Sequence, residues 1–458
     1  MTTGQEQEIE RLKDLAADIV ARAKKGGADV AEAIARSGSE LEAKVRLGEP
    51  ELVHEAAHRG VGLRVIKDQR VALTSTSDLT ARGIDRFVAD ALELLEIAQQ
   101  DPFAGPARPE LLTKGPLPDL ELYDPRGGEV TAAEAIALAK RGEAAAREVD
   151  ARITNSDGAT FSRTAGGFAL VLSSGFAAGY SGSFSSIVVS PVADDEGGKK
   201  RRGFHYSAKR FLADLDEPEA VGREAARRTL RKLGAKKVPT CEAPVVFDPD
   251  AARAILGTMG GCIMGSSIWR KSSYLVGREG TPVASELVTI VDDPLRKRMP
   301  GSRPFDGEGL AARKNVVVEK GVLKQYLCDS YAGRKLDRDP TASASRGGGG
   351  GVGPSTSNFL LLPTDTRAKD IVKGTKRGLY VTEMMGFGFN AVTGDFSRGA
   401  SGFWIEDGEF AHPVSEVTIS LNVDELWKRV DAVGDDLDPR SSTAAPTFRV
   451  SAMTIAGS

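Results

Sequence analysis

The spacing of apolar residues changes several times along the chain and predicts helices and strands in turn. Apolar residues recur at helical spacing in residues 5–25, which predicts an amphipathic helix. From 29 to 47 apolar and polar residues alternate as in a half-buried strand, and the segment GLRVIKDQRVALTST, residues 62–76, predicts a hairpin. A second helix is expected over residues 80–99, capped by Ser77 or Asp78. The chain therefore opens with helix, strands and helix.

The next part of the pattern repeats this mixture after a proline-rich connector at residues 100–128. Thr131 and Glu134 have the spacing of a capping box, which predicts a helix to about residue 148. Antiparallel strands should follow as far as residue 192, with a turn at Asp157 and Gly158. A further charged helix is expected over about 217–234.

From residue 244 onward the pattern is mostly strand and turn. The Asp407 and Gly408 pair lies between alternating apolar runs and predicts a hairpin, and Asn422 with Glu425 should cap a short helix near 423–432. The predicted fold class is α+β, with N-terminal α/β units that contain antiparallel strands and a large β-rich C-terminal domain. The predicted domains are an N-terminal subdomain, a central subdomain that includes the connector, and the C-terminal domain: 1–100, 101–240 and 241–458.

Composition and charge exclude several classes of protein. The chain has 458 residues, with 61 Lys plus Arg against 64 Asp plus Glu and a formal net charge of −3. This balance leaves no excess of positive charge that would bind nucleic acid or an anionic membrane. The three cysteines are far apart, and no apolar run is long enough to span a membrane. We therefore expect a soluble, unexported cytoplasmic protein that binds neither nucleic acid nor membranes.

Residues 54–58 read HEAAH, which is the H-E-x-x-H pattern of zinc metalloproteases. In that pattern His54 and His58 would bind zinc from one face of a helix, and Glu55 would act as the general base. Glycine and proline residues on both sides leave only about nine residues for such a helix, which is marginal. The segment is expected to be a polar turn or short helix between two strands, with the metal site as the alternative.

Three other stretches have weaker chemical signatures. The loop SRGGGGGVG, residues 345–353, lacks the G-K-[ST] ending of a phosphate-binding loop, so a flexible or closely approaching loop is expected. Glu406 and Glu409 flank the Asp407 turn, where solvated carboxylates are ordinary. Cys262 lies among small and apolar residues, which favours a packed thiol over a nucleophile.

The C-terminal half carries a more specific signal. The run NAVTGDFSRGASGFWIEDGEFAHPVSEVTIS (390–420) resembles the PmbA/TldD family, formerly called modulators of DNA gyrase. The similarity extends to RPFDGEG (303–309) and SSYLVGREGTPVASELVTIVDDP (272–294), and more weakly into the N-terminal part. The resemblance implies a heterodimeric zinc metallopeptidase that degrades unfolded peptides and trims peptide precursors. Its TldD-type chain carries an H-E-x-x-x-H helix and a late cysteine that bind the metal.

The resemblance also indicates which of the two chain types this is. The metal helix should fall just before the R-K-S-S segment at 270–273, where this sequence reads LGTMGGC. Gly257, Thr258 and Cys262 then stand where His, Glu and His are expected, and no cysteine follows Cys328. The resemblance is therefore to the TldE/PmbA-type subunit, with no cofactor in this chain and zinc in its partner. That partner would be a TldD-like metallopeptidase chain, and a homodimer is possible when this chain is alone.

The same resemblance suggests where the peptide substrate would lie. An extended peptide adds a strand to an exposed sheet edge, so the turn in the C-terminal half supplies the substrate-channel candidates: Asn390, Thr393, Gly394, Asp395, Phe396, Ser397 and Arg398. An equally weighted interpretation is that these residues only shape the turn. Two other functions remain open. One is an autonomous zinc peptidase that uses His54, Glu55 and His58, and the other is a non-enzymatic interaction protein that modulates gyrase or another toxin target.

Overall fold

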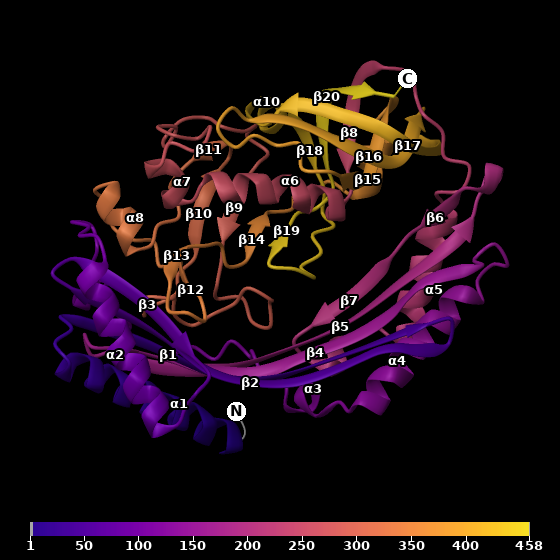
Figure 1. The fold of residues 1–458 in the computed structure, drawn as a ribbon. Coiled ribbons are helices and arrows are strands. Elements are labelled where there is room, and N and C mark those ends of the chain that lie inside the picture. The colour runs from indigo at the N-terminus through magenta and orange to yellow at the C-terminus, as the bar shows by residue number, and fades with distance from the viewer. Residues whose placement is uncertain (1–2, 458) are drawn as a thin grey trace.

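A long bowed sheet forms one side of the molecule in the computed structural model, which describes residues 3–457. Its strand order is β3-β2-β1-β4-β5-β6, and β7 also pairs with β5. The C-terminal domain lies on the concave side of this arch, and helices cover the convex side (Figure 1). The bounds of these strands are β1 Val30–Arg46, β2 Glu49–Lys67, β3 Arg70–Thr76, β4 Asn155–Leu172, β5 Ala177–Asp194, β6 Lys200–Arg202 and β7 His205–Lys209.

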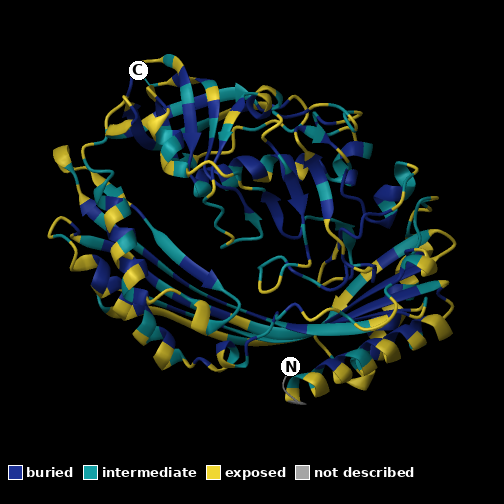
Figure 2. Cartoon of the chain, turned by 180° about the vertical axis from the view of Figure 1, so that it is seen from behind, coloured by how far each residue is buried: buried dark blue, intermediate teal, exposed yellow. Residues whose placement is uncertain are grey.

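The helices of the first half pack their apolar faces on the convex side of the arch. In the view coloured by burial, exposed residues gather on their outer faces (Figure 2). The bounds are α1 Thr3–Lys25, α2 Ala81–Ile97, α3 Pro125–Glu129, α4 Ala132–Arg147 and α5 Pro218–Leu230, with 3-10 turns η1 Pro109–Leu111, η2 Glu196–Gly198 and η3 Leu212–Asp214. The predicted capping box at Thr131 and Glu134 is confirmed, with both of its hydrogen bonds present. The cap of α2 is Thr80 rather than Ser77 or Asp78, because Asp78 instead accepts the Thr80 hydroxyl.

Two predicted turns have opposite outcomes. Asp68 and Gln69, with φ of 48° and 59°, form the tight turn of the predicted β2–β3 hairpin. The predicted turn at Asp157 and Gly158 is wrong, because both residues lie inside β4. The register shifts there between Ser156 and Gly158, and Gly158 has φ of 107°, as in a β-bulge. A glycine with positive φ is found in β-bulges as well as in tight turns, so the local sequence does not distinguish the two.

The C-terminal domain is built on a second sheet with the order β17-β16-β15-β8-β20-β18. An additional pairing of β17 with β20 closes this sheet onto itself. The predicted hairpin at Asp407 and Gly408 is confirmed between β16 and β17. The strands are β8 Cys241–Phe247, β15 Arg377–Met385, β16 Asp395–Glu406, β17 Glu409–Asn422, β18 Val430–Val433 and β20 Phe448–Ala456.

Smaller elements complete this domain beside the closed sheet. A five-stranded sheet has the order β11-β10-β9-β14-β19, and β12 pairs with β13 in a separate ribbon. Their bounds are β9 Ile290–Asp292, β10 Asn315–Glu319, β11 Val322–Leu323, β12 Ala344–Arg346, β13 Val352–Pro354, β14 Phe359–Leu361 and β19 Thr443–Ala444. The helices are α6 Pro249–Cys262, α7 Gly265–Trp269, α8 Ser330–Lys335, α9 Ala368–Lys373 and α10 Val423–Lys428. The predicted α+β fold class is confirmed.

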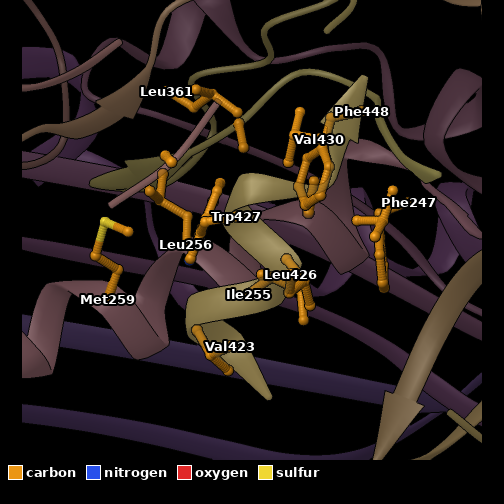
Figure 3. Packing of buried hydrophobic residues seen from close by; sticks show 14 of the residues in the cluster. Phe247, Ile255, Leu256, Met259, Leu361, Val423, Leu426, Trp427, Val430 and Phe448 are labelled. Carbon is orange, nitrogen blue, oxygen red and sulfur yellow. The ribbon is translucent and has the colours of Figure 1, made fainter. Parts of the chain in front are cut away.

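The largest core cluster joins α6 and α10 to the closed sheet (Figure 3). Trp427 of α10 is fully buried and lies against Phe448 with ring centroids 5.6 Å apart. Ile255, Leu256 and Met259 of α6 enter the same cluster. Burial of these large side chains contributes about 1.5–3 kcal/mol each, so α6 is firmly held by its apolar face.

Two buried contacts join the arch to the C-terminal domain. The Glu32 carboxylate of β1 accepts hydrogen bonds from Arg64 at 2.9 Å and from Arg346 at 2.7 Å. The glycine-rich loop approaches β2 so closely that a Cβ at Gly62 would lie 2.3 Å from the Gly348 carbonyl oxygen. The predicted close approach of this loop is therefore observed. The first two predicted subdomains both contribute strands to the arch, because β1 pairs with β2 on one side and β4 on the other.

Candidate functional site

Helix α6 presents small residues where the resemblance places the metal ligands. Gly257 and Gly261 are both exposed one turn apart, and a Cβ added at either would meet no heavy atom within 4 Å. The Thr258 hydroxyl donates to the Ile255 carbonyl of its own helix at 2.7 Å. This face of α6 therefore has room for larger side chains, but Gly257 and Thr258 offer neither an imidazole nor a carboxylate.

Cys262, the third of these positions, lies in the core rather than on the open face. Its side chain belongs to the largest buried cluster, and the residue is 1% exposed. The sulfur lies 4.0 Å from the Ala391 carbonyl oxygen. Burial raises the pKa of the Cys262 thiol to about 11, so it stays protonated at neutral pH. A metal ligand has to be the thiolate, so this thiol is poorly suited to bind zinc.

The structure brings one of the α6 positions, Cys262, next to the turn that holds the substrate-channel candidates. The turn between β15 and β16 packs against the C-terminal end of α6, where Tyr274 donates its backbone N–H to the Ala391 carbonyl at 2.8 Å. Phe389 and Ala391 pack on the same core cluster as Cys262. Cys262, at the C-terminal end of α6, and the 390–398 segment, which are far apart in the sequence, therefore lie next to each other.

Most polar groups of this turn are used within it. The Asn390 side chain accepts from the Val392 N–H at 3.0 Å, and the Thr393 hydroxyl donates to Asp395 at 2.6 Å. The Asn422 amide donates to the Thr393 carbonyl at 2.8 Å. Gly394 has φ of 80°, a conformation that favours glycine, and is buried beside Asn422. These contacts make the TGDF segment a rigid, self-bonded turn.

The remaining candidates differ in what they present. Phe396 is buried in the core, whereas Ser397 is exposed. The Arg398 Nε is buried without a hydrogen-bond partner among residues 3–457, and burial lowers the pKa of the guanidinium. The tip of the same hairpin exposes three apolar side chains, with exposed fractions of 53% for Met385, 101% for Phe387 and 55% for Val392. The surface of this turn is therefore more apolar than its sequence motif indicates.

The HEAAH segment lies in neither a turn nor a helix, so that expectation is wrong. Residues 54–58 belong to β2, in which side chains alternate between the two faces of the arch. His54 lies 3.3 Å from Glu40, whereas Glu55 accepts from Arg163, which also donates to the Val130 carbonyl beside the covering helices. Four residues of strand span roughly 13 Å, so His54 and His58 are too far apart to share a metal ion.

Sequence reasoning missed one further group, which lies on the concave face of the arch. Arg36, Phe168 and Tyr180 line two adjoining hollows of about 330 Å³ and 170 Å³, the second of which also reaches Arg303. Arg303 lies in the RPFDGEG segment that carries the resemblance, but the sequence gives no sign that it lines the same hollow as Arg36. The fold alone brings these residues together.

Two further findings concern the described part of the chain. Among residues 3–457, no group of three or more His, Cys, Asp or Glu side chains is arranged to hold a metal ion. No helix within that range is both long and apolar enough to cross a membrane.

Comparisons with known proteins place the chain in a family. Residues 240–457 match the PmbA/TldA metallopeptidase C-terminal domain, residues 125–233 the central domain and residues 31–95 domain 1. The metalloprotease PmbA of Escherichia coli O157:H7 is 36% identical over 432 residues, which cover 94% of this chain and 93% of the relative. The chain therefore belongs to the PmbA/TldD metallopeptidase family.

Solved structures agree with this assignment. A putative modulator of DNA gyrase from Bacteroides thetaiotaomicron has a TM-score of 0.91 and 28% identity, and the match covers 97% of this chain and 99% of that one. TldE from Thermococcus kodakarensis shares the fold with a TM-score of 0.87 at 22% identity, over 97% of this chain and 100% of that chain.

The family is one of metallopeptidases, so the fit of zinc to this chain can be tested on its residues. At the α6 positions where the resemblance places two ligands and a base, this chain has a glycine, a threonine and a protonated buried thiol. In β2 the strand separates the two histidines and places the glutamate on the other face. The residues present do not fit a catalytic zinc ion at either place.

Proposed function

We propose that this chain is the TldE/PmbA-type subunit of a heterodimeric zinc metallopeptidase, and that it does not itself hold the zinc ion. The observation that carries the proposal is the replacement of an expected His, Glu and His by Gly257, Thr258 and Cys262 on a well-formed helix. Zinc and the hydrolytic step would belong to a TldD-like partner chain. The substrates would be unfolded peptides and peptide precursors in the cytoplasm.

The position of the α6 glycines supports a role beside an active site on another chain. Because side chains are absent at Gly257 and Gly261, backbone on this face is open to close approach. The adjacent hairpin tip keeps Asn390, Thr393 and Asp395 exposed. In the proposed complex these residues border the peptide channel, and an extended peptide is held there mainly through main-chain hydrogen bonds.

The apolar hairpin tip gives the partner a place to dock. Met385, Phe387 and Val392 are exposed together on the turn that packs against α6. Exposed aromatic and methionine side chains that cluster in this way are typical of the core of protein interfaces. The TldD-like chain is the proposed occupant, because docking here would bring its metal helix next to the degenerate α6 face. Self-association of the isolated chain through the same tip is the expected alternative state.

The test is complex formation with the TldD-like chain of the same organism, measured by size-exclusion chromatography with light scattering. The wild-type mixture should elute as a 1:1 heterodimer, and Phe387→Ser should weaken it by roughly tenfold or more, as expected for an aromatic anchor. Ile97→Ser is the matched control, because Ile97 is 82% exposed at the end of α2, far from this turn in sequence. Absence of a complex with the wild-type chain would contradict the proposal.

A further inference from the structure

Two arginines that line the smaller hollow, Arg36 of β1 and Arg303 of the C-terminal domain, form no ion pair within residues 3–457. Arg303 has its Nε and one terminal nitrogen buried without a hydrogen-bond partner among residues 3–457, and no ion pair involves it in that range. Arg36 donates from one terminal nitrogen to the Arg346 carbonyl at 2.6 Å, whereas its Nε is buried and unpaired within the described chain. A buried N–H without a partner destabilises the folded chain, and more strongly when the group is charged.

The acids near these arginines already have other partners. The Glu32 carboxylate is held by Arg64 and Arg346, and Asp306 accepts from three backbone N–H groups, those of Glu308, Leu310 and Ala344. Asp292 accepts from the Ser357 N–H at 2.6 Å. Asp306 lines the smaller hollow, and both Asp306 and Asp292 lie near enough for their charges to interact with that of Arg303. Three arginines, Arg36, Arg303 and Arg346, line the same hollow, which therefore keeps a surplus of positive charge.

Tyr180 lies at the meeting point of the two hollows. Burial raises the pKa of its hydroxyl, which is opposed by the nearby charges of Arg303, Arg210 and Arg36. The phenol therefore stays a neutral hydrogen-bond donor. Its ring lies 4.6 Å from Phe168 and 5.5 Å from Phe305, centroid to centroid. The hydroxyl thus adds a third donor near the two guanidinium groups.

The walls of the hollows have two chemical characters. Apolar side chains line the smaller hollow beside the arginines: Ile34, Phe168, Leu170 and Phe305. In the larger hollow Gly38 pairs with Gly166 across β1 and β4, and the His58 ring lies over Gly38, where a Cβ would be 2.9 Å from it. Glycines inside strands often mark a place where another backbone approaches closely. Guanidinium groups beside an apolar wall match the carboxylate end of a peptide whose last side chain is apolar.

We propose that this hollow binds the C-terminal carboxylate of a peptide whose last residue is apolar. The carboxylate accepts from Arg36, Arg303 and the Tyr180 hydroxyl, and the last side chain packs against Phe168 and Phe305. Arginine suits this role because its planar donor fork matches a carboxylate. The hollow of about 170 Å³ has room for more than a single water, whose share of liquid volume is about 30 Å³. The proposal rests on the proposed function only in taking a peptide as the ligand.

The experiment measures binding of fluorescein-labelled peptides to the full chain by fluorescence anisotropy, with no partner and no hydrolysis. One peptide ends in Leu with a free carboxylate, and the second is its C-terminal amide. The third is the amide with an internal glutamate, which distinguishes a side-chain carboxylate from a terminal one. The wild-type chain should bind the free acid roughly tenfold more tightly than either amide.

Variants locate the effect. Arg303→Gln and Arg36→Gln should each abolish the preference for the acid, and Tyr180→Phe, which keeps the ring, should reduce it. Arg82→Gln, an exposed arginine of α2, should leave it unchanged. Thermal unfolding confirms that each variant is folded, and the comparison of acid and amide on the wild-type chain does not depend on any variant.

Three results would overturn the inference. The first is equal binding of the acid and the amide, and the second is a preference for the acid that survives both arginine variants. The third is displacement of the acid peptide by inorganic phosphate and by acetate at the same concentration, which would indicate a general anion site. Because the readout needs no TldD-like chain, failure to form a heterodimer would not affect it. Conversely, loss of the carboxylate preference would leave the proposed subunit role standing.

Discussion

Arg163 donates to Glu55 at 3.3 Å on the helix-covered side of the arch, the face opposite to that of His54. The glutamate of HEAAH is therefore directed away from the histidines that it would have to serve. Glu55 and His54 point to opposite faces because side chains alternate between the faces of a strand. The metalloprotease motif instead needs a helix, in which residues four apart share one face.

We therefore expect His54→Ala and Glu55→Gln to leave the zinc content of the chain unchanged, along with the peptidase activity of its complex with the TldD-like chain. The measurement is metal analysis by mass spectrometry together with hydrolysis of a fluorogenic peptide. A loss of bound zinc in His54→Ala would show that the motif is a metal site after all.

Two helix glycines should respond in opposite ways to the same added methyl group. Gly257→Ala should stabilise the chain by about 0.5–1 kcal/mol, because the site is open and alanine is the better helix former. Gly222→Ala should destabilise it by about 1–3 kcal/mol, because the new Cβ would lie 2.1 Å from the Gly142 carbonyl oxygen. Denaturant unfolding measures both. Destabilisation by Gly257→Ala would mean that this face of α6 is covered.

Asp248 makes stability depend on pH. It caps α6 by accepting from the Ala251 N–H at 2.8 Å, and burial raises its pKa to about 7. Between about pH 4 and pH 7 the folded chain therefore holds a proton that the unfolded chain releases, so this carboxyl lowers stability as the pH rises.

Asp248→Asn keeps the capping acceptor and removes the ionisation. Its unfolding free energy relative to the wild type should rise from pH 4 to pH 7 by as much as about 4 kcal/mol, and then level off. Asp248→Ala should gain less, because it also loses the cap. A constant difference between Asn variant and wild type across this range would contradict the assignment.

The Glu32 carboxylate should be essential to the contact between the arch and the C-terminal domain. Glu32→Gln leaves the buried guanidinium groups of Arg64 and Arg346 without their counter-charge, which should destabilise the chain by about 3–5 kcal/mol. Glu93→Gln, an exposed change on α2, is the control and should stay within about 0.5 kcal/mol of the wild type. Equal stability of the two variants would show that the triad does not hold the domains together.

Local chemistry explains which parts of the fold could be predicted. The Thr131 capping box and the Asp407 turn depend on residues within a few positions of each other in the sequence, and both predictions are confirmed. HEAAH was expected to be a turn or short helix because glycines and a proline flank it. At Gly62, however, the lack of a side chain allows the close approach of the loop at Gly348. Pairing of β2 with β1 along nearly their whole length keeps the HEAAH segment extended.

The candidate site shows the same division. The sequence could locate Gly257, Thr258 and Cys262 through the resemblance, but not that Cys262 is buried against the turn at Ala391. It gave no sign that Arg36 and Arg303 line one hollow, because that hollow exists only where the arch and the C-terminal domain pack together.

The central claim is that this chain supports, but does not contain, a zinc active site. Its most direct test measures zinc content and peptide hydrolysis for the purified chain alone and then mixed with the TldD-like chain from the same organism. We predict a zinc-free, inactive single chain, and a zinc-containing, active complex after mixing. About one zinc ion per single chain, together with peptide cleavage by that chain, would contradict the account.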